Sequence, residues 1–362
     1  MAGMKYVDLR SMHHLMDGLS FRVRRCAEVL DHALVNVNEK NRVPDRIVAW
    51  NARGGPLNGE PLSLPGTKRL IVQIEETFDP RKKETLTLAS VGETEDKTTA
   101  PAAFFNMHSL SLDVPMRVEV PLRTLLKGGQ DLKGKYVVYL HALLTDDDRE
   151  YVYYGITKRG WNRRFLEHTK TALGSETRRL FPNTLQELIR THMDRRAGRR
   201  SDGVGLSGLV TAVCAAGLDE DAAMDVEEYL VDKYSLASKH PLGLNMIPGG
   251  KEGIRRLHEL TGPQLGTSKD TEEREDALDR YLAQHPALGV PKPAIAEKWN
   301  DPTYAEAVIC GRENRLTADQ VREIRYLAAL GNTKEAIRAG VGAIDLGQVE
   351  RVLAGRTYGR IR

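Results

Sequence analysis

The sequence predicts a mixed α/β (α+β) protein of two to three domains. Three observations support this: the chain has 362 residues, its centre alternates strand-like and helix-like patterns, and its C-terminal end carries helical patterns alone. We expect a central domain with a small mixed or antiparallel sheet flanked by helices at residues 131–255. Around it we expect an N-terminal α+β accessory domain at 1–130, a linker and helical segment at 256–313, and an all-α module at 314–362.

The N-terminal region, residues 1–130, carries few chemical signals. Residues 12–37 have helical spacing, and segments rich in β-branched residues predict strands at 68–77, 84–91 and 116–122. The pair His13-His14 does not predict a metal site, because adjacent histidines leave a helix in different directions. DNA recognition and self-association are both open as roles for this region.

Two segments in the centre of the chain predict a β-hairpin. VVYLHAL at 137–143 and YVYYG at 151–155 are rich in β-branched and aromatic residues, and the polar stretch TDDDRE separates them. The hairpin would place Tyr139 and Tyr153 on adjacent strands. A helical pattern follows from Trp161, and Arg164 and His168 lie four residues apart at its edge, so both can face the hairpin.

One carboxylate stands out in the helical segment 222–234. The apolar stripe of this helix consists of Ala223, Val226, Leu230 and Tyr234. Glu227 falls inside the stripe, whereas Glu228 points away from it as a solvated neighbour. A carboxylate on a buried face is costly unless it is paired or binds a metal. Glu227 therefore needs a partner, either a structural lysine or a metal ion.

Basic residues concentrate in one part of a nearly balanced chain. The net charge is +3 and the pI is about 8.6, but residues 151–200 contain twelve Lys or Arg and only four Asp or Glu. Residues 219–232 are acidic. A basic surface around one carboxylate cluster suits a polyanion brought to a metal.

Cysteine usage and hydropathy indicate a soluble cytoplasmic protein. Cys26, Cys214 and Cys310 show no paired spacing, which argues for a reducing compartment and against a zinc module. No apolar run is long enough to span a bilayer, and the N-terminus lacks a signal-peptide pattern.

The segment 256–313 predicts a linker that contains a helix. It is polar at 262–276, has helical spacing at 272–284 and is Pro-rich at 285–294. Residues 295–313, which include Trp299 and Tyr304, would pack against the C-terminal module.

Three short helices are predicted in the C-terminal module. Thr317 and Gln320 form a capping box for the first helix, which Gly331 ends. The second covers 333–339, and Asp345 caps the third. The buried side of the third helix would consist of Leu346, Val349, Val352 and Leu353. Three short helices around a glycine turn resemble helix-turn-helix DNA-binding modules.

In such a module the third helix enters the major groove. Gln348 and Arg351 lie off its apolar face and would reach base edges, whereas Arg356, Arg360 and Arg362 would contact phosphates. A small three-helix bundle with another role has the same pattern, so the chemistry of the central domain is what favours DNA binding here.

The central motifs together resemble the GIY-YIG nuclease family. They occur in the expected order within residues 133–250: Val137-Val138-Tyr139, Tyr153-Tyr154-Gly155, Arg164 with His168, Glu227-Glu228-Tyr229-Leu230-Val231, and LNMIPGG at 244–250, which contains Asn245. The first two triplets depart from Gly-Ile-Tyr and Tyr-Ile-Gly but keep both tyrosines and the glycine. Alone, each residue is commonly structural, and only their joint order and spacing favours an active site.

The resemblance implies a metal-dependent phosphodiesterase. Tyr139 would be the general base, Tyr153 a second hydroxyl that orients water or phosphate, and Glu227 the ligand of one Mg²⁺ or Mn²⁺ ion. Arg164 would donate to the non-bridging phosphate oxygens, whose charge grows in the transition state. Because the ordinary pKa of tyrosine is about 10, we expect Arg164, His168 and the metal to favour the tyrosine anion.

Double-stranded DNA is the expected partner of such a site. The segment 173–208 is predicted to be a long loop and a DNA-contacting insertion, with basic residues near its end at Arg195, Arg196, Arg199 and Arg200. With the helix-turn-helix, the chain would be a homing or phage-type endonuclease. A restriction or repair nuclease of the same family and a non-cleaving DNA-binding regulator are the alternatives, and the complete residue set argues against the regulator. The target site and the oligomeric state are left open.

Overall fold

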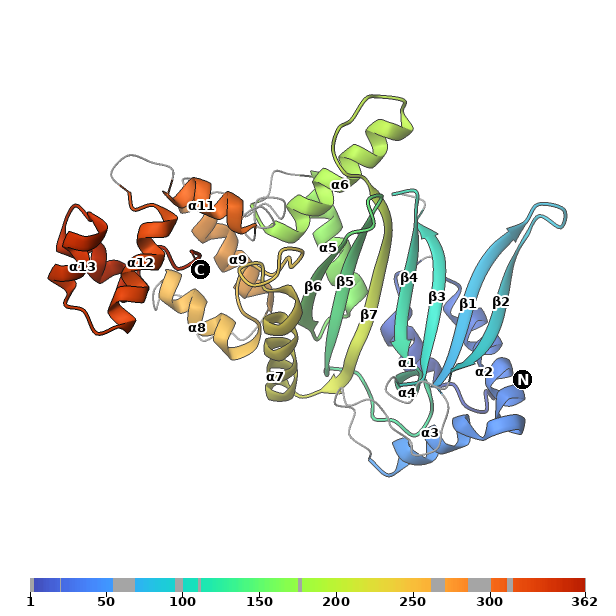
Figure 1. Cartoon of the computed structure of the whole chain (residues 1–362). Coiled ribbons are helices and arrows are strands. Elements are labelled where there is room, and N and C mark those ends of the chain that lie inside the picture. Colours follow the sequence, from blue (N-terminus) through green and yellow to red (C-terminus); the bar gives the residue numbers. More distant parts are fainter. Residues whose placement is uncertain are drawn as a thin grey trace. The chain divides into compact units, whose positions relative to one another are not determined.

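The chain forms two compact units, Met1–Val290 and Pro291–Arg362. The computed structural model describes residues 3–19, 21–54, 69–94, 100–109, 112–174, 178–261, 271–285, 301–310 and 315–361. The first unit is an α/β structure with a seven-stranded mixed sheet and flanking helices, and the second is helical (Figure 1). No helix in the described ranges is long and apolar enough to cross a membrane.

The sheet runs in the order β2-β1-β3-β4-β7-β5-β6. Its strands are β1 (Arg69–Asp79), β2 (Glu84–Thr94), β3 (Ala102–Ser109), β4 (Val114–Pro121), β5 (Tyr136–Thr145), β6 (Glu150–Thr157) and β7 (Leu206–Leu218). Neighbouring strands are antiparallel except for the parallel pairs β1·β3 and β4·β7. The predicted hairpin at 137–155 is confirmed as β5 and β6, and three predicted N-terminal strands correspond to β1, β2 and β4.

The sheet is larger than the small sheet that the sequence led us to expect. β7 pairs with β4 on one side and with β5 on the other, so the N-terminal strands and the central hairpin share one continuous sheet. The boundary expected near residue 130 falls between two strands of this sheet. The insertion of β7 between earlier strands has no local sequence signal, because its pairing joins segments far apart in the chain. The strand β3, which pairs with its neighbour β4, was not predicted.

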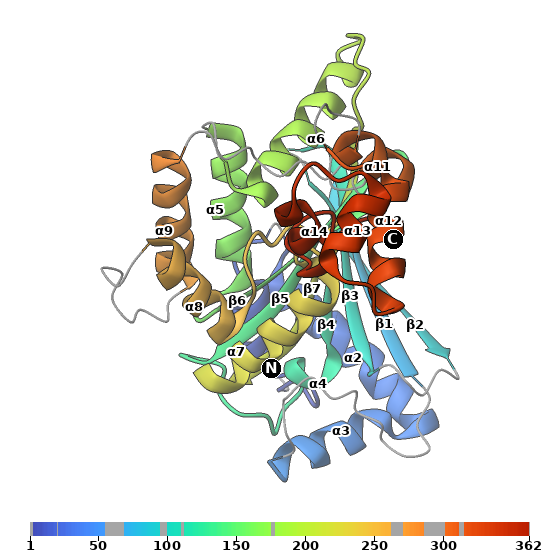
Figure 2. The ribbon, with the colours of Figure 1, turned by 60° about the vertical axis from the view of Figure 1, so that its left-hand side comes forward.

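Four helices accompany the N-terminal strands: α1 (Leu9–Met16), α2 (Val23–Asn41), α3 (Val43–Ala52) and α4 (Leu122–Leu125). The single helix predicted over 12–37 is therefore two helices. The chain turns between them at Gly18, whose φ of +84° is readily adopted by glycine alone. Figure 2 shows α2 behind the strands of the sheet and α7 (Glu220–Leu230) in front of them.

The two faces of the central strands bury alternate residues. Val137 and Tyr139 face the main core, which also contains residues of α1, α2, α5 (Trp161–Gly174) and α6 (Leu180–Arg196). Val138 faces a second cluster together with Ala223 and Met224 of α7. Helices α5 and α6 thus lie on one face of the hairpin and α7 lies on the other.

Helix α6 occupies most of the segment that was predicted as a long loop. Leu185, Leu188 and Ile189 recur at helical spacing and are buried in the main core. The loop prediction is wrong, because burial of these apolar residues stabilises a helix in spite of the basic residues near 195–200.

Two further helices, α8 (Gly250–Thr261) and α9 (Thr271–Gln284), complete the first unit. The helix predicted over 272–284 is confirmed as α9. Ala277, Leu278 and Leu282 of α9 pack with Leu257 of α8 in a small cluster of their own, with Met246 beside them. Residues 262–270, which belong to the predicted polar linker, lie outside the described residues.

The second unit contains α11 (Pro302–Cys310), α12 (Ala318–Ala329), α13 (Lys334–Val341) and α14 (Leu346–Leu353). The capping box of Thr317 and Gln320 and the cap of Asp345 on α14 are confirmed. Val349 and Val352 enter the core of this unit as predicted, but Leu353 is exposed and Leu346 is half-buried. Ile309 of α11 packs against the same core.

Parts of the predicted linker and C-terminal tail fall outside the described residues. These are the Pro-rich stretch from 286 onward, Trp299 and Arg362. Tyr304 lies within α11 and is half-buried.

Candidate active site

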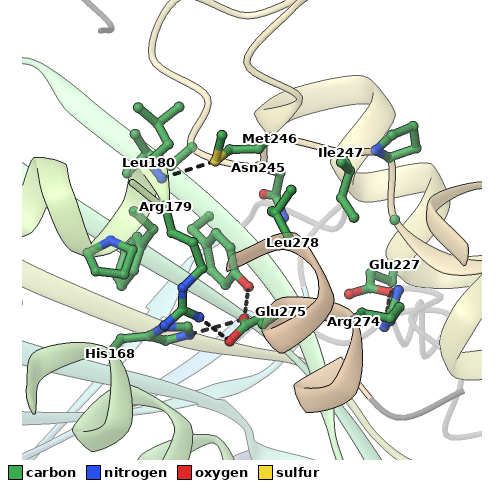
Figure 3. Close-up of a pocket in the computed structure, with 16 residues that line it drawn as sticks. His168, Arg179, Leu180, Glu227, Asn245, Met246, Ile247, Arg274, Glu275 and Leu278 are labelled. Carbon is green, nitrogen blue, oxygen red and sulfur yellow. Dashed lines mark hydrogen bonds and ion pairs between the residues drawn. The ribbon is translucent and has the colours of Figure 1, made fainter. Parts of the chain in front are cut away.

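A pocket lies at the edge of the sheet beside β6, between helices from both faces (Figure 3). It is lined by Tyr153 of β6, His168 of α5, the start of α6 from Arg179 to Pro182, Glu227 of α7, the segment 244–249, and Arg274, Glu275 and Leu278 of α9. Residues from β6, α5 and α7 were predicted to meet here. The contribution of α6 and α9 was not.

The two tyrosines lie on adjacent strands, as the hairpin prediction required. β5 pairs Tyr139 directly with Gly155 of β6, and the tyrosine side chain covers the glycine. A Cβ atom at position 155 would lie 2.6 Å from the Tyr139 hydroxyl oxygen, so only glycine fits. Tyr139 is fully buried, and its Oη has no hydrogen-bond partner among the described residues. Tyr153 donates its hydroxyl to Glu275 Oε1 at 2.9 Å.

Arg164 and His168 both face the hairpin from α5. Arg164 donates through Nη1 to Glu167 Oε2 and through Nη2 to Glu275 Oε2, each at 2.5 Å. His168 is 2 % exposed and packs edge-on against Tyr153, with ring centroids 5.3 Å apart. Its Nε2 lies 3.8 Å from Glu275 Oε1, close enough for charge interaction but not for a hydrogen bond.

Glu227 is buried in the helix face that the sequence predicted, and an arginine is its partner. Its Oε2 accepts from the Gly250 N–H at 2.8 Å and from Arg274 Nη1 and Nη2 at 3.2 and 3.1 Å. Both side chains of the Glu227–Arg274 ion pair are almost fully buried. A structural basic partner was one of the two alternatives weighed for this carboxylate, although lysine was the expected residue.

Two details of the predicted α7 segment are wrong. Tyr234 is 44 % exposed, because a π-turn at Val231–Ser235 follows α7 and shifts the helical phase. Glu228 is half-buried and accepts a hydrogen bond from the Glu252 N–H at 3.1 Å, so it caps the first turn of α8 instead of facing solvent.

Asn245 has a positioning role in the segment 244–249. Its Oδ1 accepts from the Tyr154 N–H at 3.0 Å, and its Nδ2 donates to the Tyr154 carbonyl at 2.9 Å. Ser235 donates to the same Oδ1 at 2.6 Å. This side chain therefore fastens one wall of the pocket to the backbone of β6.

Sequence reasoning missed the residues that fill the pocket, namely Arg179, Arg274 and Glu275. Arg179 donates through Nη1 to Glu275 Oε2 at 2.5 Å, so Glu275 meets two guanidinium groups and one hydroxyl. Figure 3 shows Arg179 and His168 directed toward Glu275, and Arg274 beside Glu227. The sequence around 271–276 is polar and resembles a linker, so it gave no sign of these contacts.

Burial and neighbouring charges shift the pKa of three groups at the site. Burial alone would raise the pKa of Glu275, but His168, Arg164 and Arg179 outweigh it and lower the value to about 2. Burial and the two arginines lower the pKa of His168 to about 4 despite Glu275, so its ring is neutral at pH 7. Burial also raises the pKa of Tyr139, and Arg164 opposes that rise only in part. Arg164 and His168 alone therefore do not produce the expected lowering of the tyrosine pKa.

The residues fit a single hard cation under one condition. The described part of the chain contains no group of three or more His, Cys, Asp or Glu residues that could hold a metal. Mg²⁺ needs few protein ligands and keeps several waters, so Glu227 alone can serve when substrate phosphate completes the shell. Arg274 would have to leave Glu227 first.

The four arginines expected to contact DNA lie around the end of α6 and do not line the pocket. Arg195 pairs with Asp146, Arg196 with Asp113, and Arg199 with Asp194. Arg200 is 92 % exposed and lies 3.6 Å from Asp202. Neighbouring carboxylates thus compensate most of the positive charge that the sequence suggested for this segment.

The residues of the second unit that were predicted to contact DNA differ in how far the protein itself engages their side chains. Gln348 Oε1 accepts from the Ile344 N–H at 2.9 Å, and the Gln348 N–H donates to Asp345 Oδ1 at 2.7 Å, so this residue is engaged at the start of α14. Arg351 is half exposed, with Nη2 4.0 Å from Asp345. Arg356 and Arg360 are exposed in the tail that follows α14.

Neither a protein-family model, nor a curated protein, nor a solved structure matches this chain. The resemblance to GIY-YIG nucleases therefore rests on the sequence motifs alone.

Proposed function

We propose that this protein is a metal-dependent DNA endonuclease whose active site is the GIY-YIG-like pocket beside β6. Residues predicted from separate sequence motifs meet at one pocket, and this observation carries the proposal. Tyr153 and His168 line the pocket on one face of the hairpin, where Arg164 donates to the lining residue Glu275. Glu227 reaches the same pocket from the helix on the other face. The basic side already binds a carboxylate, as a site for an anionic phosphodiester should.

The residues divide the chemistry between them. Arg164 and Tyr153 receive the non-bridging oxygens of the phosphodiester, whose charge grows as water attacks phosphorus. A divalent cation such as Mg²⁺ or Mn²⁺, held by Glu227, would supply Lewis-acid stabilisation to the departing oxygen. Tyr139 is the base that the family resemblance implies, and Arg164 opposes part of the rise that burial causes in the pKa of its hydroxyl.

We also propose that residues 315–361 bind duplex DNA as a helix-turn-helix, which gives the arrangement of a homing or phage-type enzyme. Support comes from the capped helices α12 to α14, the left-handed turn at Gly342, and the exposed arginines after α14.

The test of the proposed function is cleavage of supercoiled plasmid with and without Mg²⁺ or Mn²⁺. We expect nicked or linear product with the metal and none with EDTA. Glu227→Gln should lose this activity. Asp225→Asn serves as the matched control, because Asp225 is an exposed carboxylate on the same helix. Equal cleavage by both variants would contradict the assignment.

A non-cleaving DNA-binding protein is the second candidate, and one observation favours it. The only predicted metal ligand forms a buried ion pair with Arg274, and such a pair is costly to separate. This candidate predicts DNA binding without cleavage in either metal, including in an Arg274→Ala variant.

A further inference from the structure

The Glu275 carboxylate occupies a position in which the surrounding hydrogen-bond donors could bind an anion. Its carboxylate accepts from the Tyr153 hydroxyl, from Arg164 Nη2 and from Arg179 Nη1 at 2.9, 2.5 and 2.5 Å. These donors come from β6, α5 and the start of α6, whereas Glu275 belongs to α9. Three elements thus build a cationic cradle, and a fourth supplies the anion.

The chemistry of the cradle matches a phosphodiester. A carboxylate and a phosphodiester each carry one negative charge spread over two oxygens, and two guanidinium groups are the preferred partners of both. Arg164 and Arg179 are largely buried, with side chains 5 % and 14 % exposed. Without an anion between them, Arg164 would retain Glu167 and Arg179 would retain Asp279, but the two guanidinium groups would face each other at a largely buried site, which is unfavourable.

The helix that carries Glu275 packs separately from the main core. Ala277, Leu278 and Leu282 of α9 belong to a small apolar cluster with Leu257, whereas Phe181 and Leu185 of α6 belong to the main core. Movement of α9 would therefore expose the cradle without opening the core that positions it.

We propose that Glu275 holds the place of the substrate phosphodiester, and that Arg179 is a second phosphate-binding arginine beside Arg164. The proposal rests on the proposed function for the identity of the substrate, but not for the existence of the anion site. Arg179 lies outside the motifs that carry the family resemblance. Its contact with Glu275 assigns it to the site.

Inorganic phosphate tests the anion site independently of cleavage. Isothermal titration calorimetry should show at least about 10-fold tighter phosphate binding by Glu275→Gln than by the wild-type chain, because the glutamine keeps the shape but not the charge. The double variant Glu275→Gln/Arg179→Gln should lose this gain. The matched control is Asp276→Asn, which removes an exposed carboxylate of the same helix. It should bind phosphate as the wild type does.

Three results would overturn the proposal: equal phosphate binding by the wild type and Glu275→Gln, a gain that survives in the double variant, or failure of both Glu275→Gln and Glu275→Ala to fold. The last would make Glu275 a structural partner of the arginines.

Plasmid cleavage separates this proposal from the proposed function. In the Glu275→Gln background, Arg179→Gln should slow cleavage by about 10²-fold, the size of effect seen when one transition-state donor is removed. An unchanged rate would mean that Arg179 serves only Glu275, and would overturn its assignment. If Glu275→Gln binds phosphate more tightly but the protein cleaves no plasmid in Mg²⁺ or Mn²⁺, the result would support the anion site and contradict the proposed nuclease function.

Discussion

The two halves of the pocket carry opposite charge, and consecutive residues of α9 compensate both. The basic half, Arg164 and Arg179, pairs with Glu275. The acidic half is Glu227, which pairs with Arg274. A nuclease needs the same two halves for opposite ligands, a phosphate on one and a metal cation on the other. On the proposed function, Glu275 of α9 occupies the place of the phosphate and Arg274 of the same helix occupies the place of the metal cation.

The largest expected effect concerns the acidic half. Glu227→Ala should abolish cleavage while leaving DNA affinity nearly unchanged, because the substitution removes the metal ligand and leaves the basic half intact. Plasmid cleavage and a gel-shift titration would measure the two properties. Wild-type activity in this variant would remove the acidic half from the chemistry.

Arg274→Ala separates the metal role of Glu227 from a purely structural one. Removing one partner of a buried ion pair should lower the free energy of unfolding by about 3 to 5 kcal/mol. If the carboxylate then accepts a cation, Mn²⁺ should restore part of this loss, measured by urea denaturation with and without the metal. Arg280→Ala, an exposed position on the same helix, is the control. Destabilisation that Mn²⁺ leaves unchanged would argue for a structural pair.

The basic half is tested by Arg164→Lys. Lysine keeps the charge but loses the planar pair of donors, so we expect cleavage to slow by about 10²-fold. Single-turnover kinetics at saturating metal would show the change. A variant that cleaves at the wild-type rate would mean that Arg164 is needed only to hold Glu275.

Sequence preference should depend on neither half of the pocket. If α14 reads bases, Arg351→Ala should relax specificity by about 1 to 3 kcal/mol at one base position, whereas Arg360→Ala should weaken binding to all sequences alike. Binding titrations on selected and random duplexes would compare them. If removal of residues 312–362 leaves the site preference unchanged, the residues that recognise the DNA sequence would lie in the first unit instead.

The smallest expected effect is a pH dependence of stability from His168. Its pKa is lowered to about 4 in the folded chain against about 6.5 when unfolded, so the unfolded state binds more protons between these values. Stability should therefore fall as the pH drops below 6.5, by about 1 kcal/mol for this residue by pH 5.5. In urea denaturation at pH 6.5 and pH 5.5, His168→Phe should lose the part of the pH dependence of stability that His168 contributes. Parallel curves for the two proteins would contradict the lowered pKa.

Local sequence patterns predicted the parts of the site that depend on local geometry. Alternation along the hairpin placed Tyr139 and Tyr153 on adjacent strands, and helical spacing put Glu227 on a buried face. The register that sets Tyr139 against Gly155 was not predicted and is a finding of the structure.

Contacts between distant segments could not be predicted in the same way. Arg179 and Glu275 are unremarkable charged residues in their own helices, and only the folded chain brings their atoms together. The same holds for β4 and β7, whose pairing follows from complementary edges and not from any local period. Periodicity reports which face of an element is buried, but not what covers it.

The place of β7 in the sheet also fixes when the sheet can close during synthesis. Its residues 206–218 are made after both of its neighbours, β4 and β5. Until they emerge, the strands made earlier form two separate groups, each with an unpaired backbone edge. The final step is thus a long-range closure by a central strand, the kind of contact that makes folding slow and leaves nascent chains open to aggregation.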